Sequence, residues 1–421
     1  MIFIYLITLI IAPQLWIEPF VGLRTDLLLY PIWLLVIIFS GKLNKFLTLK
    51  SLDYFIIAFI TWVFIASMVN EGNALTSKFI VDYIKWFVLY KFIVTTLDDD
   101  IDKLNSVIYK MLFLIYIIVL EGFEHKFSYD GLGWAGQPLG WVDQSVLDAG
   151  GTGRTQWINI FDGPGVFCVI YTIALPFIIK YFDKHYEFKT RLIALVALIP
   201  LLMAIWFTGS RGGFLATLGI LASYGVIRVA KTMGISISRI LLMGALAFSA
   251  LLLAPSYLTQ VKDDNNSAQH RVDMWMQGIE MVQQNPLFGI GKGNYAEYTG
   301  SLIAHNSAIE NMGELGMPGL FFWVGMMYIA FRYLYLFSST SENVAHISTS
   351  NAVALCLIGY LLSSMFVTLE YETLYIILAF ASVFGNAYKT EIKIGKRDYM
   401  IIGSICIGWV ILLKVFVSMY Y

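Results

Sequence analysis

The sequence predicts an all-α, polytopic integral membrane protein with about 12–13 transmembrane helices. The chain has 421 residues, of which 58% are hydrophobic and 14% charged, and its mean hydropathy is +0.71. A soluble domain carries roughly 25% charged residues, so a water-soluble enzyme with one buried core is excluded. Apolar runs of about 16 to 22 residues recur along the chain, close to the length of about 20 that crosses a hydrocarbon core. The net charge of −1 provides no basic surplus for binding nucleic acid.

The apolar runs define the expected spans in order along the chain. They are residues 1–13, 26–41, 52–69, 79–95, 105–121, 158–179, 192–209, 212–228, 237–254, 317–337, 350–368, 372–388 and 399–418. The stretch from Leu192 to Ile227 contains a single charge, Arg211, yet one helix of that length would extend about 54 Å. We therefore predict two spans there, joined by a turn at Gly209-Ser210-Arg211-Gly212-Gly213.

The basic residues predict the orientation of these spans, because cytoplasmic loops are enriched in lysine and arginine. Of the 28 lysines and arginines, 18 fall on one side of this topology and 8 on the other, with Lys85 and Lys414 inside spans. The richer side, which includes Lys103 and Lys180, is predicted to be cytoplasmic, and the N-terminus lies there. The predicted extracytoplasmic side holds Arg24, Lys78, Lys126, Arg154, Arg211, Lys262, Arg271 and Lys292.

This topology divides the chain into consecutive parts. They are N-terminal transmembrane helices (1–121), a first long extracytoplasmic loop (122–157), central transmembrane helices with the Ser-Arg-Gly-Gly turn (158–254), a large extracytoplasmic helical loop (255–316) and C-terminal transmembrane helices (317–421). Long loops are uncommon unless they are functional. In the second one, apolar residues from Val272 to Val282 recur at helical spacing before Asn285-Pro286, and a second short helix is predicted from His305 to Gly316.

The position of Arg211 between two apolar spans needs an explanation, because an arginine near the bilayer centre costs about 2.5–3.5 kcal/mol on insertion scales. One interpretation is an interfacial side chain that reaches lipid headgroups. The other is an anion site, in which the guanidinium and the backbone of Ser210, Gly212 and Gly213 at a helix start bind a phosphate. The glycines favour the second interpretation because they allow positive φ and a close approach of the ligand.

Two further arginines fall on the same predicted side. Arg154 precedes Trp157 and the next span, and its ordinary interpretation is an interfacial anchor. Arg271 stands next to His270 and before Asp273, where an exposed ion pair worth less than about 1 kcal/mol is the ordinary interpretation. Together with Arg211 they favour a shared anion site.

His305, in the sequence Ala304-His305-Asn306-Ser307, is either a helix-capping or packing residue or a general base. A neutral imidazole accepts a hydroxyl proton near pH 7. Glu310 and Glu314 follow on the same predicted helix, where one of them orients the ring or both are solvated. No group of residues has metal-ligand spacing, so no metal or other cofactor is expected. Closely spaced glycines from Gly289 to Gly293 do not open a βαβ unit and predict a flexible turn.

The segment Thr208-Gly209-Ser210-Arg211-Gly212-Gly213-Phe214-Leu215-Ala216 resembles the O-antigen polymerase and ligase superfamily, bacterial membrane glycosyltransferases with a Ser-Arg-Gly-Gly signature at such a turn. The resemblance continues through Arg271 with Trp275, residues 285–291, His305-Asn306-Ser307 and residues 314–320. Arg154 is followed after ten residues by Gly165, which is similar to an arginine-ten-glycine pattern of polymerase loops. The segment Asp162-Gly163-Pro164-Gly165 departs from the Asp-Pro-Asn or Asn-Pro-Asn of many relatives.

The resemblance implies a fold like that of the C-type membrane glycosyltransferases and a multi-pass protein of the bacterial cytoplasmic (inner) membrane. By this resemblance, Arg211 and Arg271 hold the diphosphate of an undecaprenyl-diphosphate-linked glycan, and His305 activates the acceptor hydroxyl. Arg154 assists, and the substrate-binding residues include Ser210, Gly212, Gly213 and Asn306. The expected enzyme is a metal-independent, inverting glycosyltransferase whose active site faces the extracytoplasmic side.

The expected activity is polymerisation of lipid-linked oligosaccharide repeat units into O-antigen, capsule or exopolysaccharide, with a flippase and a chain-length regulator as partners. The first alternative is a ligase that transfers the glycan to lipid A core in lipopolysaccharide or to another acceptor, since the donor half of the site would be common to both. A transporter or flippase of lipid-linked sugars is the alternative from another class. Transporters concentrate functional charges near the midplane, whereas the unusual charges of this chain concentrate in the predicted outer loops.

Overall fold

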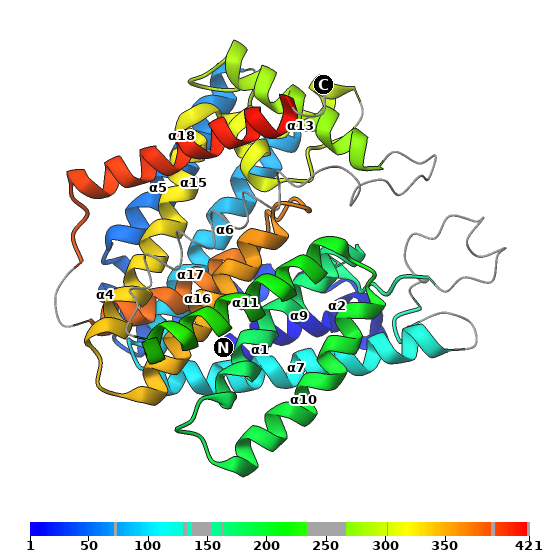
Figure 1. Ribbon diagram of the computed structural model, residues 1–421, viewed down its shortest axis with the longest axis vertical. Helices are drawn as coiled ribbons and strands as arrows, with labels where there is room; N and C mark the ends of the chain where they lie inside the picture. The colour runs from blue at the N-terminus through cyan, green and yellow to red at the C-terminus, as the bar shows by residue number, and fades with distance from the viewer. Residues whose placement is uncertain are drawn as a thin grey trace. The chain divides into compact units, whose positions relative to one another are not determined.

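A computed structural model describes residues 1–70, 74–128, 133–136, 153–161, 163–233, 267–300, 302–388 and 392–418 (Figure 1). Over these residues the chain is helical and contains no strand. The helices are α1 (Ile2–Leu6), η1 (Ile7–Ile11), α2 (Pro13–Trp16), η2 (Glu18–Phe20), α3 (Thr25–Phe39), α4 (Leu43–Leu47), α5 (Ser51–Val69), α6 (Ala74–Leu97), α7 (Ile101–Phe127), η3 (Asn159–Phe161), α9 (Pro164–Ile179), η4 (Lys180–Phe182), α10 (Phe188–Phe207), α11 (Arg211–Met233), α13 (Ser267–Gln284), α14 (Tyr295–Thr299), α15 (Ser307–Thr340), α16 (Val344–Ser363), α17 (Glu372–Ala387) and α18 (Lys396–Ser418).

The predicted fold class is confirmed. Within the described residues, 7 helices are long and apolar enough to cross a membrane: α5, α7, α9 with η4, α10, α15, α16 and α18. A helix also covers every other predicted span except 237–254, which lies outside the described residues. Among these remaining helices, α17 is shorter than a membrane span, and α6 carries more charged residues over any 18 residues than the spans do over their most apolar 18.

Two compact units share the chain. Unit 1 consists of residues 1–54, 83–218 and 326–393, and unit 2 of residues 55–82, 219–325 and 394–421. In unit 1, α9 is the central helix, because it is apolar all round and buries nearly every side chain. It packs mainly against α16 and α10. The outer face of α10 carries exposed side chains such as Ile193 and Val196, as expected where lipid replaces protein contacts.

Unit 2 is built around α5 and the first part of α15, which run side by side in Figure 1 and are crossed by α18. Tyr399 of α18 stacks on Phe55 of α5 and on Phe321 of α15, with ring centroids 6.1 and 6.4 Å apart. The amphipathic helix predicted around residues 272–282 is confirmed as α13, which contacts α18 and α14. The helix predicted to end at Gly316 does end there, because the backbone of Gly316 is non-helical (φ 69°, ψ −170°), and the second helix of α15 begins directly after this kink.

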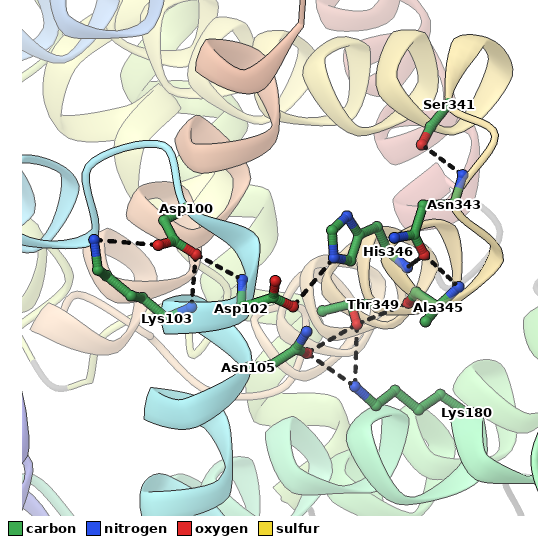
Figure 2. Close-up of polar contacts among 10 residues, drawn as sticks. All are labelled: Asp100, Asp102, Lys103, Asn105, Lys180, Ser341, Asn343, Ala345, His346 and Thr349. Carbon is green, nitrogen blue, oxygen red and sulfur yellow. Dashed lines mark hydrogen bonds and ion pairs between the residues drawn. The ribbon is translucent and has the colours of Figure 1, made fainter.

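A polar cluster joins the starts of α7 and α16 to the end of α9 in unit 1 (Figure 2). Asn105 Oδ1 accepts hydrogen bonds from Lys180 Nζ at 3.3 Å and from Thr349 Oγ1 at 3.0 Å. His346 Nε2 lies 3.2 Å from Asp102. Lys103 and Lys180, both assigned by the sequence to the cytoplasmic side, therefore lie at the same end of unit 1. The other end of α7 continues to Phe127, past its predicted end at residue 121.

Candidate active site

The turn between α10 and α11 carries the first cluster of predicted site residues, in unit 1. α10 ends at Phe207 and α11 begins at Arg211, as the length of the apolar stretch predicted. The φ of Gly209 is +57°, a conformation that an L side chain rarely adopts. Ser210 caps α11: its hydroxyl accepts a hydrogen bond from Gly213 N at 3.1 Å, and its carbonyl accepts one from Phe214 N at 2.9 Å.

Arg154 lies beside this turn. Its Nε donates to the Thr208 carbonyl at 2.9 Å, and the neighbouring Thr155 N donates to the Phe207 carbonyl at 3.1 Å. Burial, and then the positive charge of Arg211, lower the pKa of the Arg154 guanidinium. The structure thus brings Arg154 and Arg211 together, the first half-buried and the second exposed at the start of α11.

The pair of guanidinium groups suits an anion. Among the described residues no carboxylate forms an ion pair with Arg154 or Arg211. At the start of α11, the amides of Gly213 and Phe214 donate hydrogen bonds to Ser210. The first amides of any helix point along its axis toward the N-terminal end, where they can donate to an anion. Two adjacent cations with a helix N-terminus form a favourable seat for phosphate oxygens.

Gly212 and Gly213 are buried, and the structure gives them a packing role. A Cβ at position 212 would lie 2.5 Å from Phe366 Cβ, and one at position 213 would overlap Cys168 Sγ on α9. The two glycines therefore let α11 approach α9 and the segment after α16. Neither has a positive φ, in contrast to Gly209. Their part in substrate binding stays a prediction.

We predict that Gly213→Ala lowers the free energy of unfolding by about 1–3 kcal/mol, the usual cost of overpacking a tight contact. The matched control is Gly225→Ala, also on α11, where nothing lies within 4 Å of a Cβ; it should leave stability unchanged or raise it by up to about 1 kcal/mol. Unfolding in mixed micelles measures both. Adding Cys168→Ala to Gly213→Ala should recover part of the loss, and equal stabilities for the two single variants would refute the packing role.

His305 and Arg271 form the second cluster, in unit 2. His305 is half-buried, and its pKa is lowered by burial and then by the positive charge of Arg271. The imidazole is therefore held in its neutral form at physiological pH, as a general base requires. The structure brings these two predicted residues together.

Three contacts fix the backbone around His305. Trp275 Nε1 on α13 donates to the Ala304 carbonyl at 2.9 Å. The His305 N–H donates to Glu310 Oε1 at 3.1 Å. Asn306 caps α15, since its Oδ1 accepts from Ala308 N at 3.1 Å and from Ile309 N at 3.2 Å. His305 has a φ of +50°, uncommon for a residue other than glycine, so these contacts hold a backbone that local preference disfavours.

The contact of Glu310 with His305 N was not predicted from the sequence, which left Glu310 and Glu314 as equivalent candidates to orient the ring. Glu314 has another role. Its Oε2 accepts from Lys292 Nζ at 2.7 Å, and its Oε1 accepts from Gly293 N at 3.0 Å and from Tyr295 N at 3.1 Å. The only sequence signal for these roles is the pair of glutamates, Glu310 and Glu314, shortly after His305, and it does not show which of the two contacts His305.

The glycine-rich turn over residues 289–293, which the sequence predicts to be flexible, packs closely on α15 in the structure. Ile290 N and Gly291 N donate to the carbonyls of Gly313 and Glu314 at 3.1 and 2.8 Å. A Cβ at Gly289, whose φ is +62°, would overlap the Glu314 backbone. The glycines allow the turn to pack closely on α15 at its kink.

The comparisons with known proteins address the segment that holds most of these residues. Residues 195–324 match the family model described as O-antigen ligase. This segment contains Arg211, Arg271 and His305, whereas Arg154 precedes it. No curated protein matches the chain. Within a polytopic helical membrane protein, residues 195–324 are thus similar to the O-antigen ligase family.

Proposed function

We propose that this protein polymerises undecaprenyl-diphosphate-linked oligosaccharide repeat units on the extracytoplasmic face of the bacterial cytoplasmic membrane. The observation that carries the proposal is the pair Arg154 and Arg211 at the start of α11, which has no carboxylate partner among the described residues. A departing diphosphate is the anion that such a pair would stabilise. The match of residues 195–324 to the O-antigen ligase family supports the reaction class.

The chemistry assigns a role to each cluster. Attack of an acceptor hydroxyl forms a glycosidic C–O bond while the C–O bond to the diphosphate breaks, and the electron pair leaves with the diphosphate. Arg154 and Arg211 of unit 1 stabilise the negative charge that develops there, and the assignment of Arg271 to the same diphosphate stays a prediction from the sequence. His305, with its lowered pKa, takes the proton of the hydroxyl. A single displacement of this kind inverts the anomeric centre.

The arrangement of unit 1 supports an extracytoplasmic site. Lys103 and Lys180 lie by the start of α7 (Figure 2), whereas Lys126, near its other end, donates to the Gly153 carbonyl beside Arg154 at 2.8 Å. α7 has 27 residues, a length of about 40 Å, which exceeds a hydrocarbon core of about 30 Å. The positive-inside rule places the lysine-rich end in the cytoplasm, and hence Arg154 outside.

The test is transfer by the purified full chain in lipid nanodiscs, supplied with a lipid-linked repeat unit from cells that lack this protein. A ladder of lengthened lipid-linked products without any other acceptor supports the polymerase. The second candidate is the ligase, which the description of the matching family favours. It predicts transfer only when lipid A core or another acceptor is added. Absence of product with either acceptor would refute both.

We predict that Arg271→Gln moves the acid limb of the pH–activity profile to higher pH. Arg271 helps to lower the pKa of His305, so removing its charge raises that pKa, and the base becomes protonated earlier as the pH falls. The profile of kcat/KM measures the shift. The control is the neighbouring variant Asp273→Asn, which leaves the Arg271 guanidinium in place. Its acid limb should lie closer to that of the wild type than the acid limb of Arg271→Gln does. A limb that is the same in wild type and Arg271→Gln would show that Arg271 does not act on the base.

A further inference from the structure

Buried polar side chains lie at the end of α7 and in the segment 153–157 of unit 1, outside the machinery described above. Glu121, in the last two turns of α7, is 0% exposed, and neither of its carboxyl oxygens has a hydrogen-bond partner among the described residues. Thr155, next to Arg154, is also 0% exposed, and its hydroxyl is likewise unbonded. Such atoms are rare in native proteins, and each one calls for an explanation.

The surroundings of Glu121 are tightly packed. His125 lies one turn further on the same face of α7 and is also fully buried, with its Nδ1 3.2 Å from the Gln156 carbonyl. Gly133 sits directly over the carboxyl, so a Cβ at that position would overlap Glu121 Oε1. On the side of α9, Tyr171 donates to the Ile118 carbonyl at 3.1 Å. Through His125 and Lys126, the end of α7 is thus joined to the segment that carries Arg154, and Gly133 covers the carboxyl of Glu121.

The charge state of Glu121 decides whether this packing is stable. An ionised carboxylate that is buried without a partner costs several kcal/mol even after relaxation. The nearby Lys126 donates to the Gly153 carbonyl, and Glu124 adds a like charge on the same helix. The enclosed position therefore favours the neutral acid. Among the described residues, Gly133 lies against the carboxyl, so water or new donors for an ionised Glu121 require a rearrangement at the end of α7, which His125 and Lys126 connect to the segment 153–157.

We propose that Glu121 is a proton-binding site that holds the segment 153–157, and with it Arg154, in place only while its carboxyl is protonated. The ligand of this site is a proton, and its binding is detected through the stability of the backbone hydrogen bonds of the segment 153–157. Two backbone bonds report on it: Thr155 N to the Phe207 carbonyl at 3.1 Å and Trp157 N to the Phe161 carbonyl at 3.0 Å. Loss of the proton hydrates the carboxyl and loosens both. The inference is independent of the substrate, so it stands or falls apart from the proposed function.

The experiment is hydrogen exchange of the full chain in nanodiscs from mildly acidic to alkaline pH, with rates corrected for intrinsic exchange. In the wild type, the protection of the Thr155 and Trp157 amides should fall at alkaline pH by up to about tenfold per pH unit, the slope that release of one proton imposes. Glu121→Gln, a neutral side chain of the same shape, should keep its protection throughout. Because Glu121→Gln has no carboxyl that can ionise, the wild type should lose thermal stability relative to this variant as the pH rises.

The other charged or titratable groups near the site are Glu124, His125 and Lys126 on α7, Tyr171 on α9 and Arg154 on the segment itself. Glu121→Gln leaves all of them unchanged. Glu124→Gln is the matched control, because Glu124 is exposed on the same helix, and it should still lose protection as the pH rises, starting at an equal or slightly lower pH than the wild type. Protection that falls equally in wild type and Glu121→Gln, or in neither, overturns the proposal.

A second measurement keeps the test decisive if Glu121→Gln does not fold. The infrared carbonyl band of a protonated carboxylic acid in the wild type should disappear over the same pH range in which the amides lose protection. Absence of a band that titrates in this way overturns the proposal.

Discussion

Glycan transfer by His305→Asn is expected to fall by about 10²–10⁴-fold, the range over which a positioned general base contributes. Asparagine removes the basic nitrogen but tolerates the positive φ of +50° at this position. The contacts of Trp275 with the Ala304 carbonyl and of Glu310 with the backbone N–H do not depend on the side chain at position 305. The variant should therefore keep the stability of the wild type. The measurement is the single-turnover rate with the lipid-linked donor.

His270→Asn is the matched control, since His270 is an exposed histidine on α13 beside Arg271. It should retain transfer within a few fold. If His305→Asn transferred glycan at the wild-type rate, His305 would be a capping residue only. If both variants lost activity equally, the loss would reflect the surface of α13 rather than proton transfer.

Glu314→Gln is expected to lower the free energy of unfolding by about 3–5 kcal/mol, the cost of leaving one partner of a buried ion pair. The side chains of Lys292 and Glu314 are 1% and 4% exposed, and their charged atoms lie 2.7 Å apart. Glutamine can still accept the amides of Gly293 and Tyr295 with one oxygen, but it leaves the ammonium without a counter-charge. Unfolding in mixed micelles with increasing denaturing detergent measures the change.

The double variant Lys292→Met with Glu314→Gln removes both charges and should recover most of the lost stability, because a neutral pair of similar volume is often tolerated. Lys103→Met breaks an ion pair whose side chains are 56% and 38% exposed, and should change stability by at most about 1 kcal/mol. If Glu314→Gln matched Lys103→Met, the buried pair would not hold the turn over residues 289–293 against α15.

The sequence predicts the helices well where a single physical property fixes them. The division of residues 192–228 into α10 and α11 follows from the thickness of the bilayer, and the start of α11 follows from Ser210 and Arg211. The kink in α15 follows in part from Gly316 and Pro318. The packing that holds this kink in place does not, because its bonds, such as Met317 N to the Pro286 carbonyl at 2.9 Å, join residues far apart in sequence.

The candidate site is predictable only in its parts. Arginine and histidine in a predicted extracytoplasmic loop are signals that a sequence contains. The approach of Arg154 to Thr208, or of Glu310 to the backbone of His305, depends on tertiary packing. For residues 289–293, glycine spacing does not distinguish a mobile turn from a tightly docked one, because glycine indicates a permissive backbone in both. The two kinds of turn differ in whether a neighbouring segment packs into the space that a side chain would fill at the glycine, and the sequence does not show this.

The left-handed backbone at His305 has an evolutionary consequence. Glycine and asparagine adopt this conformation more readily than histidine does, so histidine is not the residue that the turn alone would select. In duplicated copies of this protein that have lost their activity, selection for an imidazole would cease while selection for a folded chain continued. We therefore expect drift at this position toward glycine or asparagine, and such a substitution in a genome would mark a copy that no longer carries out the proposed transfer.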